Sequence, residues 1–327
     1  MSTYRTLKGY NIKSVTSDPA NPKEGQIWYN DTLNKIRTKI KINAAWSSGG
    51  AINTGRNGIE SEGTQTANVA FGGNPAAGIT GKTEEYNGTS WTESGDLNKA
   101  RGYLGSCGTQ TAALAFGGFN APGDRYLNNS EEYDGSSWTE GNNLNTGRDI
   151  LKGCGTQTAG LAFGGNKNPG GNQALTEEYN GTSWSEQNDL ATARRGCGGA
   201  GTQTAGLCFG GDQAPASPPV SLASEHYDGT SWTAGGNMPS RKEGLQSGGI
   251  QTAALMIGGG FPAVAGCHQY DGTSWTTTAD MANERADQGG SSGGGNILGL
   301  AVGSPPHGTA VEEYADTTEP VRSIDVS

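Results

Sequence analysis

The chain has little of what most proteins use to build a core or an active site. Hydrophobic residues make up 32 % of its 327 residues. No apolar stretch approaches the roughly 18 residues that a membrane-spanning helix needs, so no membrane insertion is expected. The N-terminus lacks the apolar segment of a secretory signal, which argues against Sec export. The five cysteines, an odd number, favour reduced thiols in a cytoplasm over a disulfide framework.

The chain instead holds 56 glycines and a unit that recurs six times. The unit contains an Arg, a G-T-Q-T turn, an apolar run that ends in Gly-Gly, a Glu-Glu-Tyr, an Asn/Asp-Gly turn and a Trp. Its Trp copies are Trp46, Trp91, Trp138, Trp184, Trp232 and Trp275. Its Arg copies are Arg56, Arg101, Arg148, Arg194 or Arg195, Arg241 and Arg285. Two markers that share a period of 43 to 48 residues indicate one supersecondary unit copied along the chain.

Each unit is interpreted as four short strands. In the second copy these are residues 102–107, 112–116, 130–133 and 136–140. Asp134-Gly135 is expected to supply the positive φ angles of a two-residue hairpin turn. Runs of four to six residues bounded by Gly and Asn or Asp leave no room for helices, so the chain is predicted to be all-β.

One four-stranded sheet of this size cannot bury both faces, so we expect six of them to form a six-bladed β-propeller. The last unit ends at Tyr314 without a Trp, while Trp46 precedes the first complete unit. We therefore expect the segment around Trp46 to be the outer strand of the last blade. The alternative gives that role to residues 321–326. The predicted organisation is an N-terminal basic arm (1–43), a propeller (44–316) and a C-terminal tail (317–327).

Over residues 44–316 the pattern resembles the kelch repeat family: a Gly pair after the second strand, then a Tyr, a Trp, and an Arg that leads into the next blade. The sixth copy departs from it, with Gly303-Ser304 in place of the Gly pair. No Trp-Asp dipeptide occurs, which argues against a WD40 blade. The resemblance implies a kelch-like propeller but no activity, because kelch propellers include enzymes, adaptors and lectin-like binders.

Charge is unevenly placed within a net charge of −10. The first 43 residues carry eight Lys and Arg against three Asp and Glu, and the remainder carries 14 against 29. An acidic propeller disfavours nucleic acid as a ligand. The basic arm predicts docking on an acidic surface or on another copy of the propeller, with a solvated arm as the alternative.

The arm carries a second resemblance. Residues 18–32, with Lys35-Ile36-Arg37 and Trp46, are similar to a short element of bacteriophage tail, fibre and other virion proteins, Pro-x-x-Gly-Gln-hydrophobic-aromatic-Tyr/Phe-Asn followed by a basic strand and a Trp. We expect a hairpin of residues 26–29 and 35–42 that turns at Asn30-Asp31; an ordinary hairpin packed on the ring is the alternative. The resemblance implies anchoring to other virion proteins through Trp28, Tyr29, Lys35, Arg37, Lys39 and Lys41.

The polar residues that recur with the repeat are expected to be structural. Each Arg is predicted to pair with backbone carbonyls or with a Glu of a neighbouring blade. Successive strand residues face opposite sides, so a Glu-Glu pair is no catalytic dyad. No Cys, His or Asp spacing of a metal site accompanies His226, His268 and His307, which are expected to be solvated or capping, and no cofactor is predicted. The enzymatic alternative, a glycan-acting hydrolase or an oxidase, requires a polar cluster on the axis; a channel of Gly, Ser, Ala and Cys would exclude it.

Variation between copies concentrates between the second and third strands, at residues 74–83, 119–130, 166–176, 212–224, 261–266 and 305–310. Divergent loops on a rigid scaffold predict a recognition surface, although drift without selection leaves the same pattern. The candidate recognition residues are Phe119, Arg125, Tyr126, Asn128, Asn129, Asn168, Gln173, Gln213, Phe261 and His307. We expect a non-enzymatic structural protein of a phage virion, assembled in the host cytoplasm, that binds another virion protein or a host surface polysaccharide. An intracellular kelch-type interaction module is a further alternative.

Overall fold

The computed structural model describes residues 4–7, 10–17, 19, 26–38, 44–120, 125–215, 219–260, 262–291, 295, 297–304, 308–316 and 322–324. These residues form strands, turns and loops, and no helix among them is long and apolar enough to cross a membrane. The chain divides into two compact units. Unit 1 combines Met1–Ala44 with Asp316–Ser327, and unit 2 is Ala45–Ala315.

Unit 2 contains six four-stranded antiparallel sheets that resemble propeller blades, here sheets 1 to 6 in chain order. Sheet 1 consists of β6 (Glu60–Gly63), β7 (Asn68–Phe71), β8 (Thr83–Tyr86) and β9 (Trp91–Glu93). Sheet 2 consists of β10 (Gly105–Thr109), β11 (Ala112–Phe116), β12 (Ser130–Tyr133) and β13 (Trp138–Glu140). Sheet 3 consists of β14 (Lys152–Thr156), β15 (Ala159–Phe163), β18 (Thr176–Tyr179) and β19 (Trp184–Gln187).

The other three sheets repeat this order. Sheet 4 consists of β20 (Gly198–Thr202), β21 (Ala205–Phe209), β22 (Ser224–Tyr227) and β23 (Trp232–Ala234). Sheet 5 consists of β24 (Gln246–Ile250), β25 (Ala253–Ile257), β26 (Cys267–Tyr270) and β27 (Trp275–Thr277). Sheet 6 consists of β28 (Gly289–Ser291), β29 (Leu298–Ser304), β30 (Gly308–Ala315) and β5 (Ala45–Ser48). A small hairpin, β16 (Asn166–Lys167) with β17 (Gly171–Asn172), lies in the loop of sheet 3.

The strands expected from the sequence exist, and two details differ. The first strand of sheet 2 begins at Gly105, three residues later than predicted, and Gly102 instead forms an isolated bridge with Phe119. The Asp-Gly turn is a four-residue loop, because Tyr133 lies opposite Trp138 in the ladder. Of the Asp-Gly pair only the glycine has a positive φ, 92° at Gly135. The Asp carboxylate accepts hydrogen bonds from the next two serine amides at 2.9 and 2.8 Å, which stabilises the loop.

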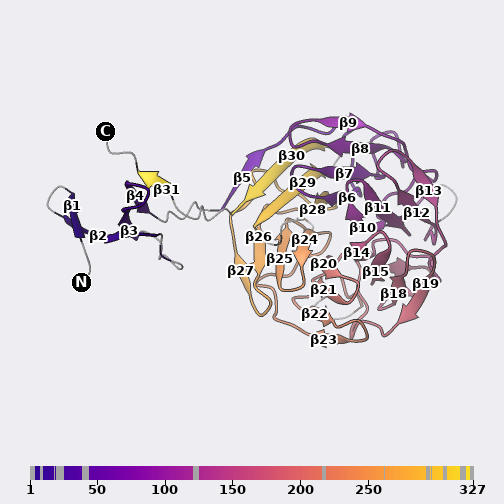
Figure 1. Cartoon of the computed structure of the whole chain (residues 1–327). Coiled ribbons are helices and arrows are strands. Elements are labelled where there is room, and N and C mark those ends of the chain that lie inside the picture. Colours follow the sequence, from indigo (N-terminus) through magenta and orange to yellow (C-terminus); the bar gives the residue numbers. More distant parts are fainter. Residues whose placement is uncertain are drawn as a thin grey trace. The chain divides into compact units, whose positions relative to one another are not determined.

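The six sheets are arranged around a common centre, with the first strand of each innermost and the fourth outermost (Figure 1). Neighbouring first strands contact one another all the way round, from β6 with β10 to β28 with β6. Where the chain enters these strands, six backbone hydrogen bonds of 2.7 to 3.0 Å run from one sheet to the next and return to the first. The residues in this cycle are Gly58, Tyr103, Ile150, Gly196, Gly244 and Asp287.

All six residues of the cycle have φ between 49° and 59°. Glycine adopts this left-handed conformation readily, whereas for a β-branched residue such as Ile150 it is strained. The strain is tolerated because each amide and each carbonyl in the cycle gains a partner near the centre, where unpaired backbone groups are costly. The hydrogen-bond cycle therefore determines the backbone conformation of the three non-glycine members.

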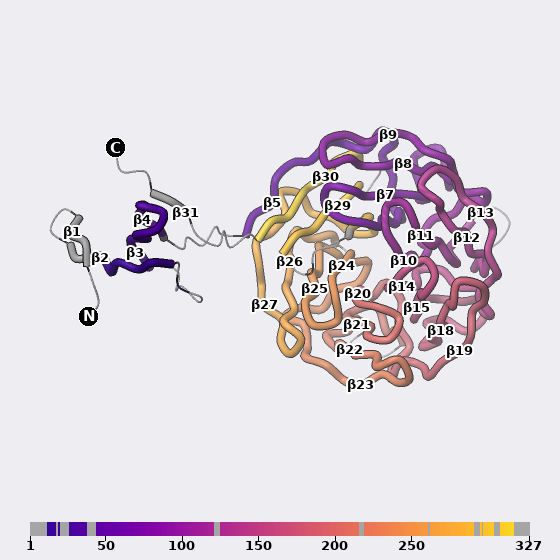
Figure 2. The backbone as a smooth tube through the Cα atoms, viewed as in Figure 1, coloured from indigo at the N-terminus to yellow at the C-terminus, as the bar shows by residue number. Residues whose placement is uncertain are grey.

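The first and last strands of unit 2 pair in sheet 6, as predicted. Trp46 lies opposite Tyr314 in the antiparallel ladder of β5 and β30, with ring centroids 5.2 Å apart. The Trp46 indole N–H donates to the Ala279 carbonyl of sheet 5 at 3.0 Å. Figure 2 shows β5 beside β30 at the two ends of unit 2. The alternative that placed residues 321–326 in this sheet is wrong, because β31 (Arg322–Ile324) pairs with β4 (Lys35–Thr38) in unit 1.

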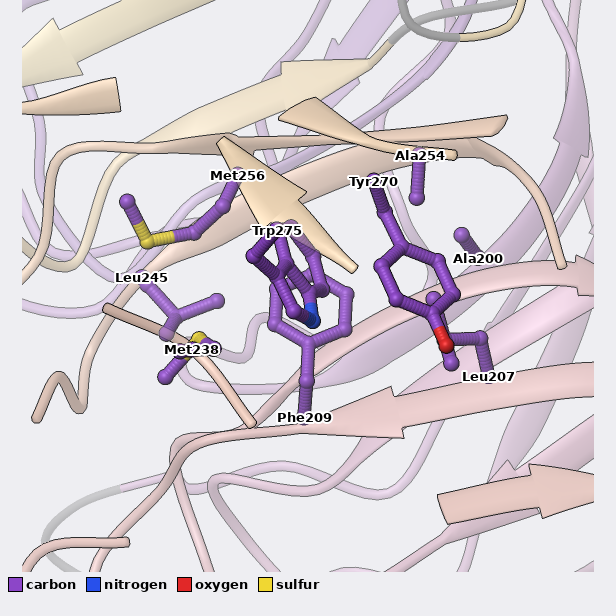
Figure 3. Close-up of a cluster of buried hydrophobic side chains, with 9 residues drawn as sticks. All are labelled: Ala200, Leu207, Phe209, Met238, Leu245, Ala254, Met256, Tyr270 and Trp275. Carbon is purple, nitrogen blue, oxygen red and sulfur yellow. The ribbon is translucent and has the colours of Figure 1, made fainter. Parts of the chain in front are cut away.

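The hydrophobic core lies between neighbouring sheets. The phenylalanine that ends a second strand packs on the tryptophan of the next sheet, as Phe209 does on Trp275 at a centroid distance of 4.5 Å. Figure 3 shows this cluster between sheets 4 and 5, formed by Ala200, Leu207, Phe209, Met238, Leu245, Ala254, Met256, Tyr270 and Trp275. The same contact joins Phe71 with Trp138, Phe116 with Trp184, and Phe163 with Trp232. Burial of such a side chain contributes about 1.5–3 kcal/mol.

Polar residues of the repeat also join neighbouring sheets. Tyr133 of sheet 2 donates its hydroxyl to Glu85 of sheet 1 at 2.5 Å. Gln157, from the G-T-Q-T turn of sheet 3, donates to the carbonyls of Ala113 and Tyr133 in sheet 2 at 3.0 and 2.6 Å. The second Glu of the Glu-Glu-Tyr motif and the Gln of the turn are therefore structural, as expected for residues with the period of the repeat.

The first Glu of the motif binds the arginine of its own sheet. Arg148 Nη2 lies 2.9 Å from Glu177 Oε1, and Nη1 donates to the Gly164 and Leu175 carbonyls at 2.7 Å each. The carbonyl partners were predicted, but the Glu belongs to the sheet that the arginine enters, so its assignment to a neighbouring blade was wrong. The equivalent pairs are Arg56–Glu84, Arg101–Glu131, Arg194–Glu225 and Arg285–Glu312.

Unit 1 is a five-stranded sheet in the order β1 (Tyr4–Leu7), β2 (Tyr10–Val15), β3 (Ile27–Asn30), β4, β31. The predicted hairpin is β3 with β4, but it turns at residues 31–34, because Asn30 pairs with Lys35. The pairing of β2 with β3 is parallel. Neither β1 nor β2 was expected from the sequence, and the C-terminal strand was expected only in the alternative that placed residues 321–326 in the last blade.

Candidate functional site

The loops between second and third strands share one end of the sheets with the links that enter the first strands. Four loops are hydrogen-bonded to the next link through the amide of its repeat arginine at 3.0 to 3.2 Å. These bonds join Thr80 to Arg101, Leu127 to Arg148, Gln173 to Arg194 and Val264 to Arg285. We call the surface formed by these loops and links the loop face. Antiparallel pairing within each sheet explains the arrangement, since second strands end where first strands begin.

The second loop holds five of the predicted recognition residues, and two of them, Phe119 and Arg125, are in contact. The exposed Arg125 guanidinium lies 5.5 Å from the Phe119 ring centroid, a cation–π geometry. Tyr126 is half-buried, with φ of 64°. The Asn128 and Asn129 carbonyls accept hydrogen bonds from the next link and from the repeat arginine. The backbone of both asparagines is therefore held in place.

The third and fourth loops contact each other. The Asn172 side-chain amide donates to the Asp212 carbonyl at 2.9 Å. The side-chain amides of Gln173 and Gln213 donate within their own loops at 2.8 and 3.0 Å. Asn168, at the tip of the β16–β17 hairpin, is exposed. The structure thus joins these two loops into one surface.

The remaining predicted site residues are Phe261, His307 and the residues of the N-terminal arm. Phe261, His307, Lys39 and Lys41 lie outside the described residues. In unit 1, Trp28 is fully buried, so its side chain belongs to the core of that unit. Lys35 is exposed, and Tyr29 and Arg37 are half-buried.

A polar cluster on the axis was not predicted. At or near the start of each first strand, four residues after the repeat arginine (after Lys242 in sheet 5), one position alternates between a long polar side chain and glycine. In chain order these residues are Glu60, Gly105, Lys152, Gly198, Gln246 and Gly289. The long side chains from sheets 1, 3 and 5 meet at the centre. Lys152 Nζ lies 3.0 and 2.9 Å from the two Glu60 carboxylate oxygens and donates to Gln246 Oε1, and Gln246 Nε2 donates to Glu60 at 3.0 Å. The alternation of these long side chains with glycine is present in the sequence. It was missed because the first strand was predicted to begin three residues too early, so these positions were not compared between copies.

Next to this cluster the axis contains a cavity of about 120 Å³, lined mostly by glycines and also by Glu62, Lys152, Cys107, Cys154 and Ser247. Glu62 is half-buried and accepts a hydrogen bond from Ser106 at 2.7 Å. Burial raises the pKa of Glu62 to about 8, and the nearby Glu60 carboxylate acts in the same direction. Burial also raises the pKa of the Cys107 thiol. The lining therefore favours a protonated carboxyl and neutral thiols.

On the loop-face side a cavity of about 40 Å³ is lined by Tyr103, Ile150 and Asp287 of the hydrogen-bond cycle, among others. Burial, assisted by Glu243, raises the pKa of Asp287 to about 6. Lys152 lines both cavities, so the axial cluster lies between them. Because Lys152 and Glu60 neutralise each other, neither is an available nucleophile or base in this arrangement.

Two of the histidines are hydrogen-bonded where the repeat has its glutamates. His226 Nε2 lies 2.8 Å from the Tyr270 hydroxyl, and His268 Nε2 lies 3.0 Å from the Ser240 hydroxyl. Burial lowers the pKa of both imidazoles. Within the described part of the chain, no three His, Cys, Asp or Glu side chains gather in a way that could hold a metal ion.

No protein-family model matches this sequence, and no curated protein matches it significantly. The kelch and virion resemblances therefore depend on the motif residues themselves and on the repeated four-stranded sheets.

Proposed function

We propose that the chain is a non-enzymatic structural protein of a bacteriophage virion. In this proposal unit 2 is a closed, six-bladed, kelch-like β-propeller whose loop face binds another virion protein or a glycan of the host surface. Unit 1, which carries the virion-type motif, attaches the protein to the particle.

Closure of the propeller is supported by three cyclic sets of contacts. The first is the backbone hydrogen-bond cycle near the axis. The second is the contact of each first strand with both neighbours, β28 with β6 included. The third is the set of hydrogen bonds from the motif tyrosines to the preceding sheet, such as Tyr133 to Glu85; here the Tyr86 hydroxyl of sheet 1 donates to Glu313 of sheet 6 at 2.6 Å. Closure removes exposed sheet edges, which would otherwise pair with other chains.

The binding role depends on one observation: the repeated side chains hold the sheets together, whereas the variable residues lie in loops at one end. The repeated Arg, Glu, Tyr and Gln side chains are engaged within and between sheets, as Arg148 and Gln157 illustrate. The variable residues lie together at one end of this rigid frame. A rigid frame with divergent loops suits recognition, since little conformational entropy is lost when a ligand binds.

Particle incorporation tests the proposal. Residues 45–315 expressed without unit 1 are expected to fold but to be absent from purified particles, while the full chain is incorporated. Both ends of the chain must be removed in this variant, because β31 pairs with β4. Incorporation of the fragment at the level of the full chain would contradict the anchoring role, and so would absence of the full chain from particles.

A second candidate function is a glycan-acting hydrolase or oxidase that uses the axis, favoured by the Glu62 carboxyl of the axial cavity, whose raised pKa suits a general acid. A cavity lined by Gly, Ser, Ala and Cys alone would have excluded this function, but the lining also includes Glu62 and Lys152. A turnover of host polysaccharide that is lost in Glu62→Gln and retained in a loop-face variant such as Arg125→Gln would favour the enzyme over the binding protein.

A further inference from the structure

Sheet 5 lacks the buried Arg–Glu pair of the other five sheets. Lys242 occupies the arginine position: its carbonyl accepts a hydrogen bond from Gly211 at 2.8 Å, as the Arg194 carbonyl does from Gly165 at 2.9 Å. The sequence-based assignment of Arg241 to this position was therefore wrong by one residue. The partner position is also changed, because His268 of β26 stands where the first Glu of the motif is expected. Both halves of the ion pair are thus replaced together.

The freed lysine lies on the loop face. Lys242 lines an open pocket of about 330 Å³ between sheets 4 and 5, together with Pro219, Val220, Arg241, Glu243, Gly260 and Pro262. A pocket of this volume is at the lower end of the range of about 300–1,000 Å³ for small-molecule sites. Lys242 forms no ion pair with a carboxylate among the described residues, and burial lowers its pKa. Arg241 uses one guanidinium nitrogen to bind the Val220 carbonyl at 2.7 Å. Two cations therefore face a pocket whose other walls are mainly proline and valine.

The walls of the pocket carry two cations and one carboxyl, and the Asp280 carboxylate, which lies outside the lining, interacts electrostatically with Lys242. Asp212 is paired with Arg195 at 2.9 Å. Glu243 is the one carboxyl among the described residues that line the pocket, and burial, assisted by Asp212, raises its pKa. In a chain with a net charge of −10, a site with two cations is a local exception.

We infer that this pocket binds a carboxylate-bearing sugar unit of a surface polysaccharide, an inference that rests on the proposed glycan-binding function of the loop face. Arg241 and Lys242 bind the carboxylate, since charge-assisted hydrogen bonds to carboxylates are strong. Pro219, Val220 and Pro262 contact the apolar C–H face of the sugar ring. Nucleotides fit less well, because the described lining has no aromatic ring on which a base could stack.

The test compares the full-length protein with its variants on oligosaccharides that contain glucuronic acid or N-acetylneuraminic acid, and on the same compounds with the carboxyl group reduced to an alcohol. The wild-type Kd is expected to be at least tenfold lower for the acidic forms. Lys242→Gln and Arg241→Gln should each raise that Kd about tenfold, while Lys242→Arg, which keeps the charge, should stay within about threefold. Lys35→Gln, which removes an exposed cation of unit 1, outside the loop face, is the matched control. Thermal unfolding checks that each variant is folded.

Equal affinity of the wild-type protein for acidic and reduced sugars would overturn the inference and leave the glycan-binding role of the loop face in place. A folded Lys242→Gln variant that binds the acidic sugars with wild-type affinity would also overturn the inference. A wild-type protein that binds neither form overturns the inference as well. If that protein is nevertheless incorporated into particles, the virion role stands and the loop face binds a protein; if it is not, both proposals fail.

Discussion

Arg194 and Arg195 are adjacent in sequence but differ in environment, so their replacement by methionine measures what the buried pair contributes. Arg194 has a side-chain exposure of 1 %, its Nη2 lies 2.5 Å from Glu225, and its Nη1 lies 3.0 and 3.1 Å from the Gly210 and Ala223 carbonyls. Arg195 has a side-chain exposure of 39 % and lies 2.9 Å from Asp212. The two variants lose the same chemical group from a buried and from a partly exposed site.

The expected losses differ several-fold. Arg194→Met leaves the Glu225 carboxylate buried without its partner, and breaking a buried pair in this way costs about 3–5 kcal/mol. Arg195→Met breaks a pair whose arginine is partly exposed and whose buried Asp212 keeps the Ala214 amide as a partner, so the expected loss is smaller, about 1 kcal/mol. For a unit of this length 1 kcal/mol corresponds to about 2 °C in Tm. We therefore expect Tm to fall by about 6–10 °C for Arg194→Met and by at most about 2 °C for Arg195→Met.

Urea unfolding followed by tryptophan fluorescence, together with calorimetry, measures both variants. Adding Glu225→Gln to Arg194→Met should recover part of the lost stability, because a neutral amide costs less to bury than an unpaired carboxylate. Equal losses for the two single variants, or no recovery in the double variant, would refute the argument that the buried pair stabilises each sheet.

Three further predictions concern the two ends of unit 2, the axis and the turns. Trp46→Ala should destabilise unit 2 by about 3 kcal/mol and expose β5 to proteolysis, and cleavage no faster than in the wild type would count against the pairing of β5 with β30. Because the folded-state pKa of Glu62 is raised from 4.5 to about 8, its contribution to stability is lost as pH rises between these values. Glu62→Gln should therefore flatten the pH dependence of the urea midpoint between pH 5 and 8. Glu93→Gln, at the exposed surface, should leave that pH dependence unchanged. Gly155→Ala and Gly78→Ala both place alanine at a φ near 105°, but only the first brings a Cβ to 2.3 Å from a carbonyl oxygen, that of Ala159. Gly155→Ala should cost at least about 1 kcal/mol more in urea unfolding, and equal costs would contradict the close approach.

The repeated sheets could be predicted from the sequence because their signals are local. An Asn/Asp-Gly turn between the third and fourth strands, an apolar second strand and a glycine pair each determine conformation through the residues themselves. The pairing of β5 with β30 was also predictable, since one outer strand was missing from the end of the chain and a matching one stood at its start. The virion role and the recognition residues remain predictions.

The tertiary structure alone decided which distant side chains meet. Lys152 and Glu60 are 92 residues apart, and each lies in a strand whose pattern is like that of its neighbours. Their contact follows from the number of sheets around the axis and from the register of the first strands. The change of partner in sheet 5 became visible when the backbone hydrogen bonds placed Lys242 rather than Arg241 at the position of the repeat arginine. Local sequence determines the shape of one sheet, but the neighbours of a side chain at the centre or between sheets are set by how all six sheets pack, because they come from segments that no local pattern connects.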